Sequence, residues 1–274
     1  MGTGIHPALA AYVTSVTAYD VDLGAPGVHR GLPSTELTFV LPVGEPLDVG
    51  WRGQPGSRGS RWSTLSGLHA QPAEIHHDGR QVGVQLALTT AGAAALFGVP
   101  AAALAGELVE LDEVEVATEL RDLPERLAAC APGDRATTVQ RALLDRLAAS
   151  EAPARPPAVG RALARLTRGD RVTDVAAEVG YSRRHLSSLV RRECGLTPQE
   201  MRRIGRFGRS RTFLGRMPLA EVAMRCGYAD QAHLTREWVA LAGCPPSTWL
   251  REEFPFLQDL PADHGESESH DQRS

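Results

Sequence analysis

The chain contains an internal sequence repeat. The sequence "VTDVAAEVGYSRRHLSSLVRREC" occupies residues 172–194, and "MPLAEVAMRCGYADQAHLTREWVALAG" occupies residues 217–243. Both contain Val-Ala, Gly-Tyr and His-Leu in the same order, first 47 residues apart and then, after one extra residue, 48. A register that holds over about thirty positions predicts two copies of one structural unit.

The first copy has the pattern of two short helices joined by a tight turn. Thr173 or Asp174 is the expected N-cap of the first helix, and Ser182 that of the second. Gly180 can adopt the positive φ that the turn between them requires. Apolar residues at helical spacing predict the buried faces: Val175, Ala176, Val179, Leu186, Leu189 and Val190.

The second copy follows the same pattern. Pro218 suits the first turn of a helix, Gly227 takes the place of Gly180, and Asp230 is the expected N-cap of the second helix. Its predicted buried positions are Val222, Ala223, Leu234, Trp238 and Leu241. Two helices at a steep angle around a glycine turn are the helix-turn-helix motif, and two in tandem make a specific signal.

The outer face of the second helix in each copy is free of acidic residues and carries hydrogen-bonding or short side chains. In the first copy these residues are Arg183, Arg184, Ser187, Ser188 and Arg191. In the second copy they are Gln231, Ala232, Thr235 and Arg236. We predict that these two faces bind double-stranded DNA.

Charge is distributed unevenly along the chain. It has no Lys, so all 29 basic residues are Arg. Residues 155–254 hold 18 Arg against 10 Asp and Glu, a net charge of +8, whereas the remainder is at −12. This imbalance indicates that one region meets a polyanion. The alternative is chance clustering of Arg in a biased composition.

Residues 1–149 have the pattern of a mixed, β-rich domain with helices. "ELTFVLPVGEPLDVGW" predicts short strands, and "PAEIHHDGRQVGVQLAL" predicts a β-hairpin with a type I′ turn at Asp78-Gly79. The alternating residues after this turn are Val82, Val84, Leu86 and Leu88. From residue 89 the composition becomes helical. A later helix has an apolar stripe that either packs on its own sheet or forms a homodimer: Val139, Leu143, Leu144 and Leu147.

The predicted fold class is therefore α+β, with an all-α C-terminal tandem helix-turn-helix domain. Proline-rich residues 150–157 are the expected linker, residues 158–257 the DNA-binding domain and residues 258–274 a disordered tail. We see no secretory signal and no membrane-spanning run, and four scattered cysteines suit reduced thiols. We therefore expect a cytoplasmic protein.

This arrangement resembles the DNA-binding domain of AraC/XylS-type transcription regulators. The resemblance lies in "VAAEVGYSRRHLSSLVRRECGLTP" and "LAEVAMRCGYADQAHLTREWVALAGCPPSTW" and covers about 100 residues. It implies seven helices in two subdomains, a central helix near residues 198–214, and two recognition helices in successive major-groove segments. By position, the base-facing candidates are Arg184, Ser187, Ser188, Gln231, Ala232, Thr235 and Arg236. Gly205 and Gly208 depart from a rigid central helix.

The N-terminal region resembles the sensor or companion domain of actinobacterial members of this family through "GVQLALTTAGAAALFGVPAAALAGELVEL". The resemblance implies an unknown small-molecule effector or dimerisation, and RNA polymerase as a partner if the protein is an activator. The second functional class left open is a small-molecule-binding protein or enzyme that is tethered to DNA. An enclosed polar cavity with convergent titratable groups would favour that class.

Other candidate sites have simpler interpretations. His69, Glu74, His76 and His77 could suggest a metal site, but consecutive strand residues point to opposite faces. His185 and His233 lie beside buried leucines without repeated partners, which favours a structural or phosphate-side role. Trp51 and Trp62 are expected in a core. We find no phosphate-binding glycine loop or hydrolase motif, so we expect no metal, no cofactor and no enzyme activity.

Overall fold

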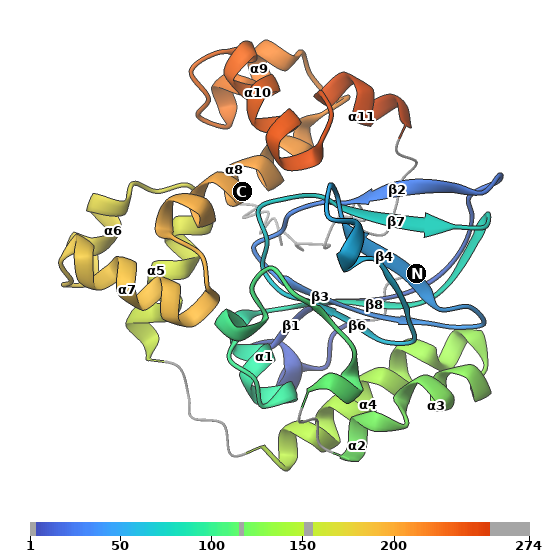
Figure 1. The fold of residues 1–274 in the computed structure, drawn as a ribbon. Helices are drawn as coiled ribbons and strands as arrows, with labels where there is room; N and C mark the ends of the chain where they lie inside the picture. The colour runs from blue at the N-terminus through green and yellow to red at the C-terminus, as the bar shows by residue number, and fades with distance from the viewer. Residues whose placement is uncertain (1–3, 115–117, 151–155, 253–274) are drawn as a thin grey trace, which may run out of the picture.

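The computed structural model describes residues 4–114, 118–150 and 156–252. Figure 1 shows a β-rich N-terminal part and two groups of C-terminal helices, one on each side of helix α8. Most of the expected linker and all of the expected tail lie outside the described residues. The expected α+β class, with an all-α C-terminal region, is confirmed.

Two antiparallel sheets form the N-terminal part. The first has the order β1 (Val13–Asp22), β8 (Arg80–Leu88), β3 (Leu37–Pro42), β6 (Thr64–Ser66) and β9 (Leu108–Val109). The second has the order β2 (Gly27–Gly31), β7 (Ala73–His77), β4 (Leu47–Trp51) and β5 (Gly59–Arg61). The sheets lie face to face in Figure 1, and a small apolar cluster that includes Tyr19, Val49 and Trp51 draws on strands of both.

The expected hairpin at Asp78-Gly79 is wrong. The two strands form where the alternation predicted them, but β7 pairs with β2 and β4, whereas β8 pairs with β1 and β3. Gly79 has φ 122°, and among the described residues only glycines have positive φ, so the turn is not type I′. A Cβ at Gly79 would collide with the carbonyl of Gly24. The glycine therefore lets the chain cross from one sheet to the other.

The main N-terminal core lies between the first sheet and the helices that cover it. Val84, Leu86 and Leu88 on β8 have no exposed surface, as the alternation predicted. In the described part of the N-terminal region, four α-helices and five short 3-10 turns accompany the strands. The helices are α1 (Thr90–Phe97), α2 (Thr118–Arg121), α3 (Leu123–Ala129) and α4 (Arg135–Ala148). The turns are η1 (Pro7–Leu9), η2 (Pro55–Ser57), η3 (Ala101–Leu104), η4 (Leu111–Glu113) and η5 (Pro132–Asp134).

Two apolar expectations have different outcomes. Val139 and Leu143 on α4 are fully buried in this core, and Leu144 and Leu147 pack against it. The stripe therefore packs on its own domain, which is the first of the two alternatives, and a homodimer stays a prediction. Trp62, in contrast, is 49% exposed, so the expectation that it fills a core is wrong. Its backbone N–H donates to Glu110 at the rim of the first sheet.

Seven helices fill residues 156–252, as the family resemblance implied. They are α5 (Pro157–Thr167), α6 (Val172–Glu178), α7 (Arg183–Cys194), α8 (Pro198–Phe213), α9 (Leu219–Arg225), α10 (Gln231–Ala242) and α11 (Pro246–Glu252). Helices α6 and α7 are the first helix-turn-helix unit, and α9 and α10 are the second. A capping box begins α8, since Thr197 accepts from the N–H of Glu200 and Glu200 accepts from that of Thr197.

Helix α8 belongs to the cores of both units. Ile204 is buried in the cluster that holds the first unit, and Phe207, one turn later, is buried in the cluster that holds the second. Phe207 packs on Trp238 of α10 with ring centroids 4.6 Å apart. The indole N–H of Trp238 donates to the buried hydroxyl of Ser210 at 2.9 Å. One continuous helix therefore fixes how the two units are placed.

The N-terminal domain contacts both recognition helices at equivalent positions of the repeat. Gly195 ends α7 and Gly243 ends α10, with φ of 75° and 74°. A Cβ at Gly195 would collide with Ala105, next to η3, and one at Gly243 would collide with Arg52. Arg52 also donates to the carbonyl of Gly243 at 2.6 Å. Glycine at both helix ends gives the N-terminal domain room to approach, against the fixed Cβ of Ala105 at Gly195 and against the Arg52 side chain at Gly243.

The two glycines of α8 provide a matched test of this packing. A Cβ at Gly205 would collide with the carbonyl of Thr167 on α5, whereas Gly208 has no atom within 4 Å of its Cβ position. We expect Gly208→Ala to raise the free energy of unfolding by about 1 kcal/mol, because alanine favours helix. We expect Gly205→Ala to lower it by about 1–3 kcal/mol through overpacking. Urea unfolding of both variants measures this, and equal effects at the two positions would contradict the packing.

Candidate nucleic-acid interface

The turn of the first unit is built largely as its sequence predicts. Gly180 has φ 72°, and the hydroxyl of Ser182 accepts from the N–H of His185 at 3.1 Å to cap α7. The expected cap of α6 is wrong. The N-cap is Arg171, two residues before Thr173 and three before Asp174, and the hydroxyl of Thr173 donates to the carboxylate of Asp174 instead.

The second unit repeats this construction with stronger capping. Gly227 has φ 74°, and the carboxylate of Asp230 accepts from the N–H of His233 at 2.6 Å. Pro218 precedes α9 as its N-cap and limits how that helix can begin. An ionised cap at the N-terminus of α10 is favoured by the helix dipole. The position of α10 is thus fixed at its first turn.

The repeated Gly-Tyr and His-Leu pairs have a packing role. The ring of Tyr181 meets that of His185 edge-on at 4.7 Å, and Tyr228 meets His233 in the same way at 5.3 Å. Nδ1 of His233 also accepts from the N–H of Ala229 at 3.3 Å. Each tyrosine therefore braces the first turn of the recognition helix that follows it.

The predicted DNA-contacting residues lie on the outer faces of α7 and α10. The exposed ones are Arg183, Arg184, Ser188, Arg191, Gln231, Ala232 and Arg236. Ser187 and Thr235 are half-buried, and the hydroxyl of Thr235 donates to the carbonyl of Gln231 at 2.9 Å. The buried faces of both helices are those that the repeat predicted, including Leu186, Leu234 and Trp238.

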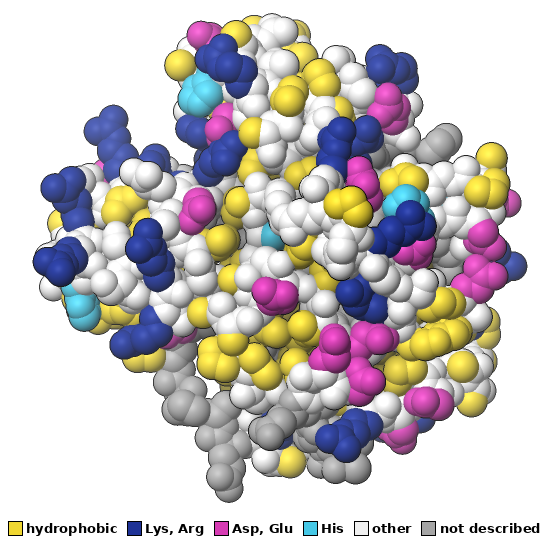
Figure 2. Space-filling model, in the orientation of Figure 1, with side chains coloured by type: hydrophobic (Ala, Val, Ile, Leu, Met, Phe, Trp, Pro, Cys, Tyr) yellow, Lys and Arg dark blue, Asp and Glu magenta, His cyan; other side chains and the backbone are white. Residues whose placement is uncertain are grey.

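A basic cleft between the two units escaped the sequence interpretation. It has a volume of about 500 Å³ and lies along α8. Its arginines are Arg171, Arg202, Arg203, Arg206, Arg209 and Arg225, and its acid is Glu237. Figure 2 shows Arg side chains gathered over the C-terminal helices and most acidic side chains over the N-terminal domain. The sequence contains the signal, because residues 202, 206 and 209 share one face of a helix, but the family resemblance assigns the central helix only the role of joining the two units.

The histidines of the N-terminal domain do not converge on a metal site. The ring of His69 packs on Trp51 at 4.5 Å, and its Nδ1 lies 2.6 Å from the carbonyl oxygen of Gln71. Burial lowers the pKa of His69 to about 4, which keeps the ring neutral at physiological pH. No group of three or more His, Cys, Asp or Glu side chains in the described part of the chain is arranged to hold a metal ion.

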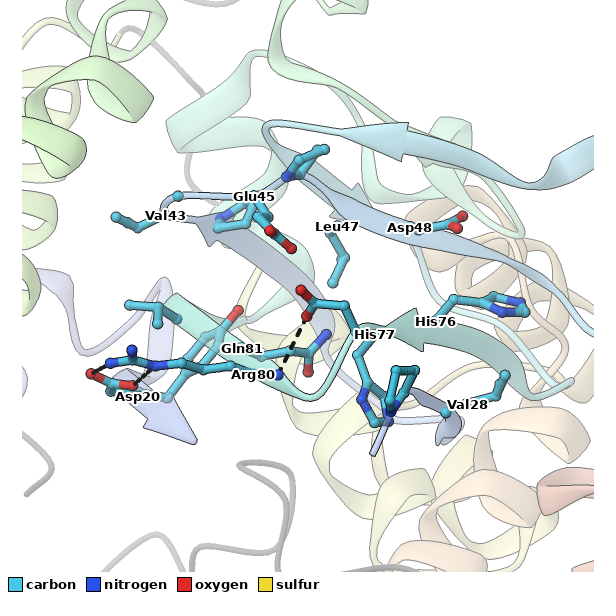
Figure 3. A pocket seen from close by; sticks show the side chains of 18 of the residues that line it. Asp20, Val28, Val43, Glu45, Leu47, Asp48, His76, His77, Arg80 and Gln81 are labelled. Atoms are coloured by element: carbon cyan, nitrogen blue, oxygen red, sulfur yellow. Dashed lines mark hydrogen bonds and ion pairs between the residues drawn. The ribbon is translucent and has the colours of Figure 1, made fainter. Parts of the chain in front are cut away.

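An open cavity of about 1190 Å³ lies between strands of the two sheets. Tyr19, Leu47 and Val82 supply apolar surface to it, and Figure 3 shows Leu47 pointing from β4 into this space. Asp20 and Arg80 lie at one end, joined by two hydrogen bonds of 2.9 and 2.8 Å. The cavity therefore offers an apolar wall and a charged end.

Two acids of this cavity, Asp20 and Asp48, are held in ion pairs with Arg80 and Arg58. The hydrogen bond from Arg80 lowers the pKa of Asp20, and that from Arg58 lowers the pKa of Asp48. Burial raises the pKa of Tyr19 far above its usual value. These shifts keep the acids charged and the phenol neutral, whereas a general acid or base needs a pKa near the working pH. Tyr19, Asp20 and Asp48 are therefore not poised to act as general acids or bases.

Residues 175–252 match the family model described as a helix-turn-helix domain. This region is an AraC-type helix-turn-helix domain. The match begins in α6 and ends in α11, so it includes both units, the central helix and the arginine cleft. No curated protein sequence matches the chain. In the described part of the chain, no helix is long and apolar enough to cross a membrane.

Similar solved structures extend the likeness to both domains. Crystal structures of ToxT from Vibrio cholerae match with TM-scores of 0.50 for strain O395 and 0.50 for fatty-acid-bound ToxT of strain SCE256. The first is 10% identical and covers 89% of this chain and 98% of its own; the second is 12% identical and covers 93% and 99%. At these identities the likeness shows a shared two-domain fold.

Proposed function

We propose that this protein is a sequence-specific transcription regulator that reads two successive major-groove segments with α7 and α10. The AraC-type domain supports DNA binding. The observation that carries the finer proposal is that both units have a capped recognition helix with an exposed outer face free of acid. One duplex face presents successive major-groove segments about 34 Å apart.

Arg184 and Arg236 are the best candidates for base contacts. Each is exposed and lies in the first two turns of its recognition helix, on the side away from the buried leucines. Arginine donates two parallel hydrogen bonds to guanine, which is the commonest specific contact in the major groove. The remaining outer-face residues are then proposed to contact bases or the sugar-phosphate backbone beside them.

Replacement of Arg236 by alanine tests base reading. We expect Arg236→Ala to weaken binding to a duplex selected from a random pool by about 1–3 kcal/mol, and to relax preference at one position. Binding to random duplex should change little. Fluorescence anisotropy with both duplexes measures this.

Arg251→Ala is the matched control, because Arg251 is exposed on α11, outside the recognition helix. We expect it to leave the selectivity for the chosen duplex unchanged. If Arg236→Ala weakened binding to both duplexes equally, Arg236 would contact phosphate rather than a base.

The N-terminal domain is proposed to sense a small amphipathic molecule and to transmit its presence to DNA binding. Its cavity supports binding of an apolar body beside Leu47 and a charged end at Asp20 and Arg80. Its contacts at Gly195 and Gly243 connect it with both recognition helices. A homodimer would need a surface other than the α4 stripe, and an RNA polymerase contact would apply if the regulator is an activator.

A long-chain fatty acid is a suitable first probe, since one of the ToxT structures holds an unsaturated fatty acid. We expect oleate to raise the melting temperature of the protein, because a ligand at 100 times its Kd adds about 2.7 kcal/mol. Val28 lines the cavity and is 51% exposed, so Val28→Trp should narrow the cavity without disturbing a core. The shift should shrink in Val28→Trp. Absence of any shift, or equal shifts in the two proteins, would count against this ligand class.

The other functional class, an enzyme tethered to DNA, gains no specific support. Asp20, Asp48 and Arg80 of the cavity are held in ion pairs, and their pKa shifts favour their charged forms. We therefore do not propose a catalytic role for them.

A further inference from the structure

The arginine cleft lies where the two units meet. Its lining takes Gly169 and Arg171 from the connection between α5 and α6, and residues 225–227 from the end of α9. The middle of the lining is the stripe on α8 that contains Arg202, Arg206 and Arg209. A single group bound in the cleft would therefore touch both helix-turn-helix units and the helix that joins them.

The cleft adjoins the DNA-reading end of the second unit. Arg206 donates to the carbonyl of Gly227 at 3.4 Å, and its guanidinium lies over the ring of Tyr228 at 4.4 Å. Tyr228 in turn packs on His233 in the first turn of α10. In helix-turn-helix proteins the first helix of the motif crosses the DNA backbone while the second enters the groove. Arg171 is the N-cap of α6 and Arg225 ends α9, so the cleft receives one arginine from the first helix of each motif.

Several of these arginines are held in place by the protein itself. Arg202 donates to the carbonyl of Gly169 at 3.2 and 3.1 Å, and Arg209 donates to the carbonyl of Thr167 at 3.3 Å. Arg203 and Arg206 share Glu237 at 2.8 and 3.2 Å. One acid against six arginines leaves the lining strongly positive. A fixed array of guanidinium groups suits phosphate oxygens, which accept charge-assisted hydrogen bonds.

We propose that this cleft binds backbone phosphates of the DNA segment that lies between the two reading windows. This inference rests on the proposed function. Between two successive major-groove windows, a duplex turns its minor groove, bordered by the phosphates of both strands, toward the same protein face. The part of the protein opposite that segment is α8 with its arginine stripe. The phosphate contact carries no sequence information and sets the spacing of the two readers along the duplex.

The test uses the arginines of the cleft that are least engaged in the fold. Arg171 has no side-chain partner in the described parts of the chain, and Arg225 makes an exposed pair with Glu221 of its own helix. The variant is Arg171→Gln with Arg225→Gln. Its control is Arg121→Gln with Arg141→Gln, which removes the same charge from exposed positions of α2 and α4. Circular dichroism should show both variants folded.

DNA affinity is measured by anisotropy from low to physiological salt, on a selected and on a random duplex. We expect the affinity of the cleft variant to fall by about a hundredfold on both duplexes, because it removes two charge-assisted contacts that are each worth about tenfold. The slope of log K against log salt should fall by about 2. The ratio of the affinities for the selected and the random duplex should be unchanged in the cleft variant. The control variant should keep the wild-type affinities and salt slope. An unchanged slope in the cleft variant would overturn the proposal, whereas a wild-type chain without DNA affinity would overturn the proposed function with it.

Two further arms separate DNA phosphate from a free phosphate ligand. Uncharged methylphosphonates replace single phosphates, one at a time, along the selected duplex. We expect those between the two windows to weaken DNA binding by the wild-type protein but not by the cleft variant. Equal weakening of both proteins at every position would refute the assignment. Inorganic pyrophosphate is titrated by calorimetry. Pyrophosphate binding lost in the cleft variant, together with an unchanged DNA salt slope, would make the cleft a site for a small ligand instead.

Discussion

The burial of helix α8 in two cores is the constraint on which the rest of the structure depends. Ile204 packs with the first helix-turn-helix unit and Phe207 with the second. Gly205 lies between them and lets α5 approach so closely that a methyl group would collide with the carbonyl of Thr167. Because the backbone of one helix is continuous, the two units cannot rotate independently without breaking one of these cores. The sequence repeat therefore forms two helix-turn-helix units at a fixed separation.

The N-terminal domain adds a second connection between the same two readers. Gly195 and Gly243 occupy equivalent places in the repeat, and both are approached by this domain. Leu32, from the loop after β2, is buried in the core of the second unit, and Arg30 pairs with Glu252 of α11 at 3.0 Å. A change in the N-terminal domain therefore has a direct path to the relative position of α7 and α10. The open cavity between its sheets is the place where a ligand would begin such a change.

The fold of the C-terminal region was predicted well because the signals that determine it are local and occur in both copies of the repeat. Capping by Ser182 and Asp230 is decided within one helical turn. The prediction of a hairpin at Gly79 was wrong because alternation shows which side chains of a strand are buried but not which strands it pairs with. The strands that pair with β7 and β8 lie far away in sequence. The prediction that Trp62 fills a core was wrong because an apolar side chain between two short strands can lie exposed at the edge of a sheet. The arginine cleft was missed because its lining comes from four separate segments that only the fold brings together.

The most direct measurement of the two-reader account is the affinity of the whole chain for selected duplexes with zero, five and ten base pairs inserted between the windows. Five pairs turn one window to the opposite face of the duplex, and ten restore the face at a greater distance. A helix buried in two cores cannot follow either change, so we expect specific affinity to collapse to that of random DNA at both insertions. Unchanged affinity at five inserted pairs would show that only one unit reads DNA, and would contradict the account.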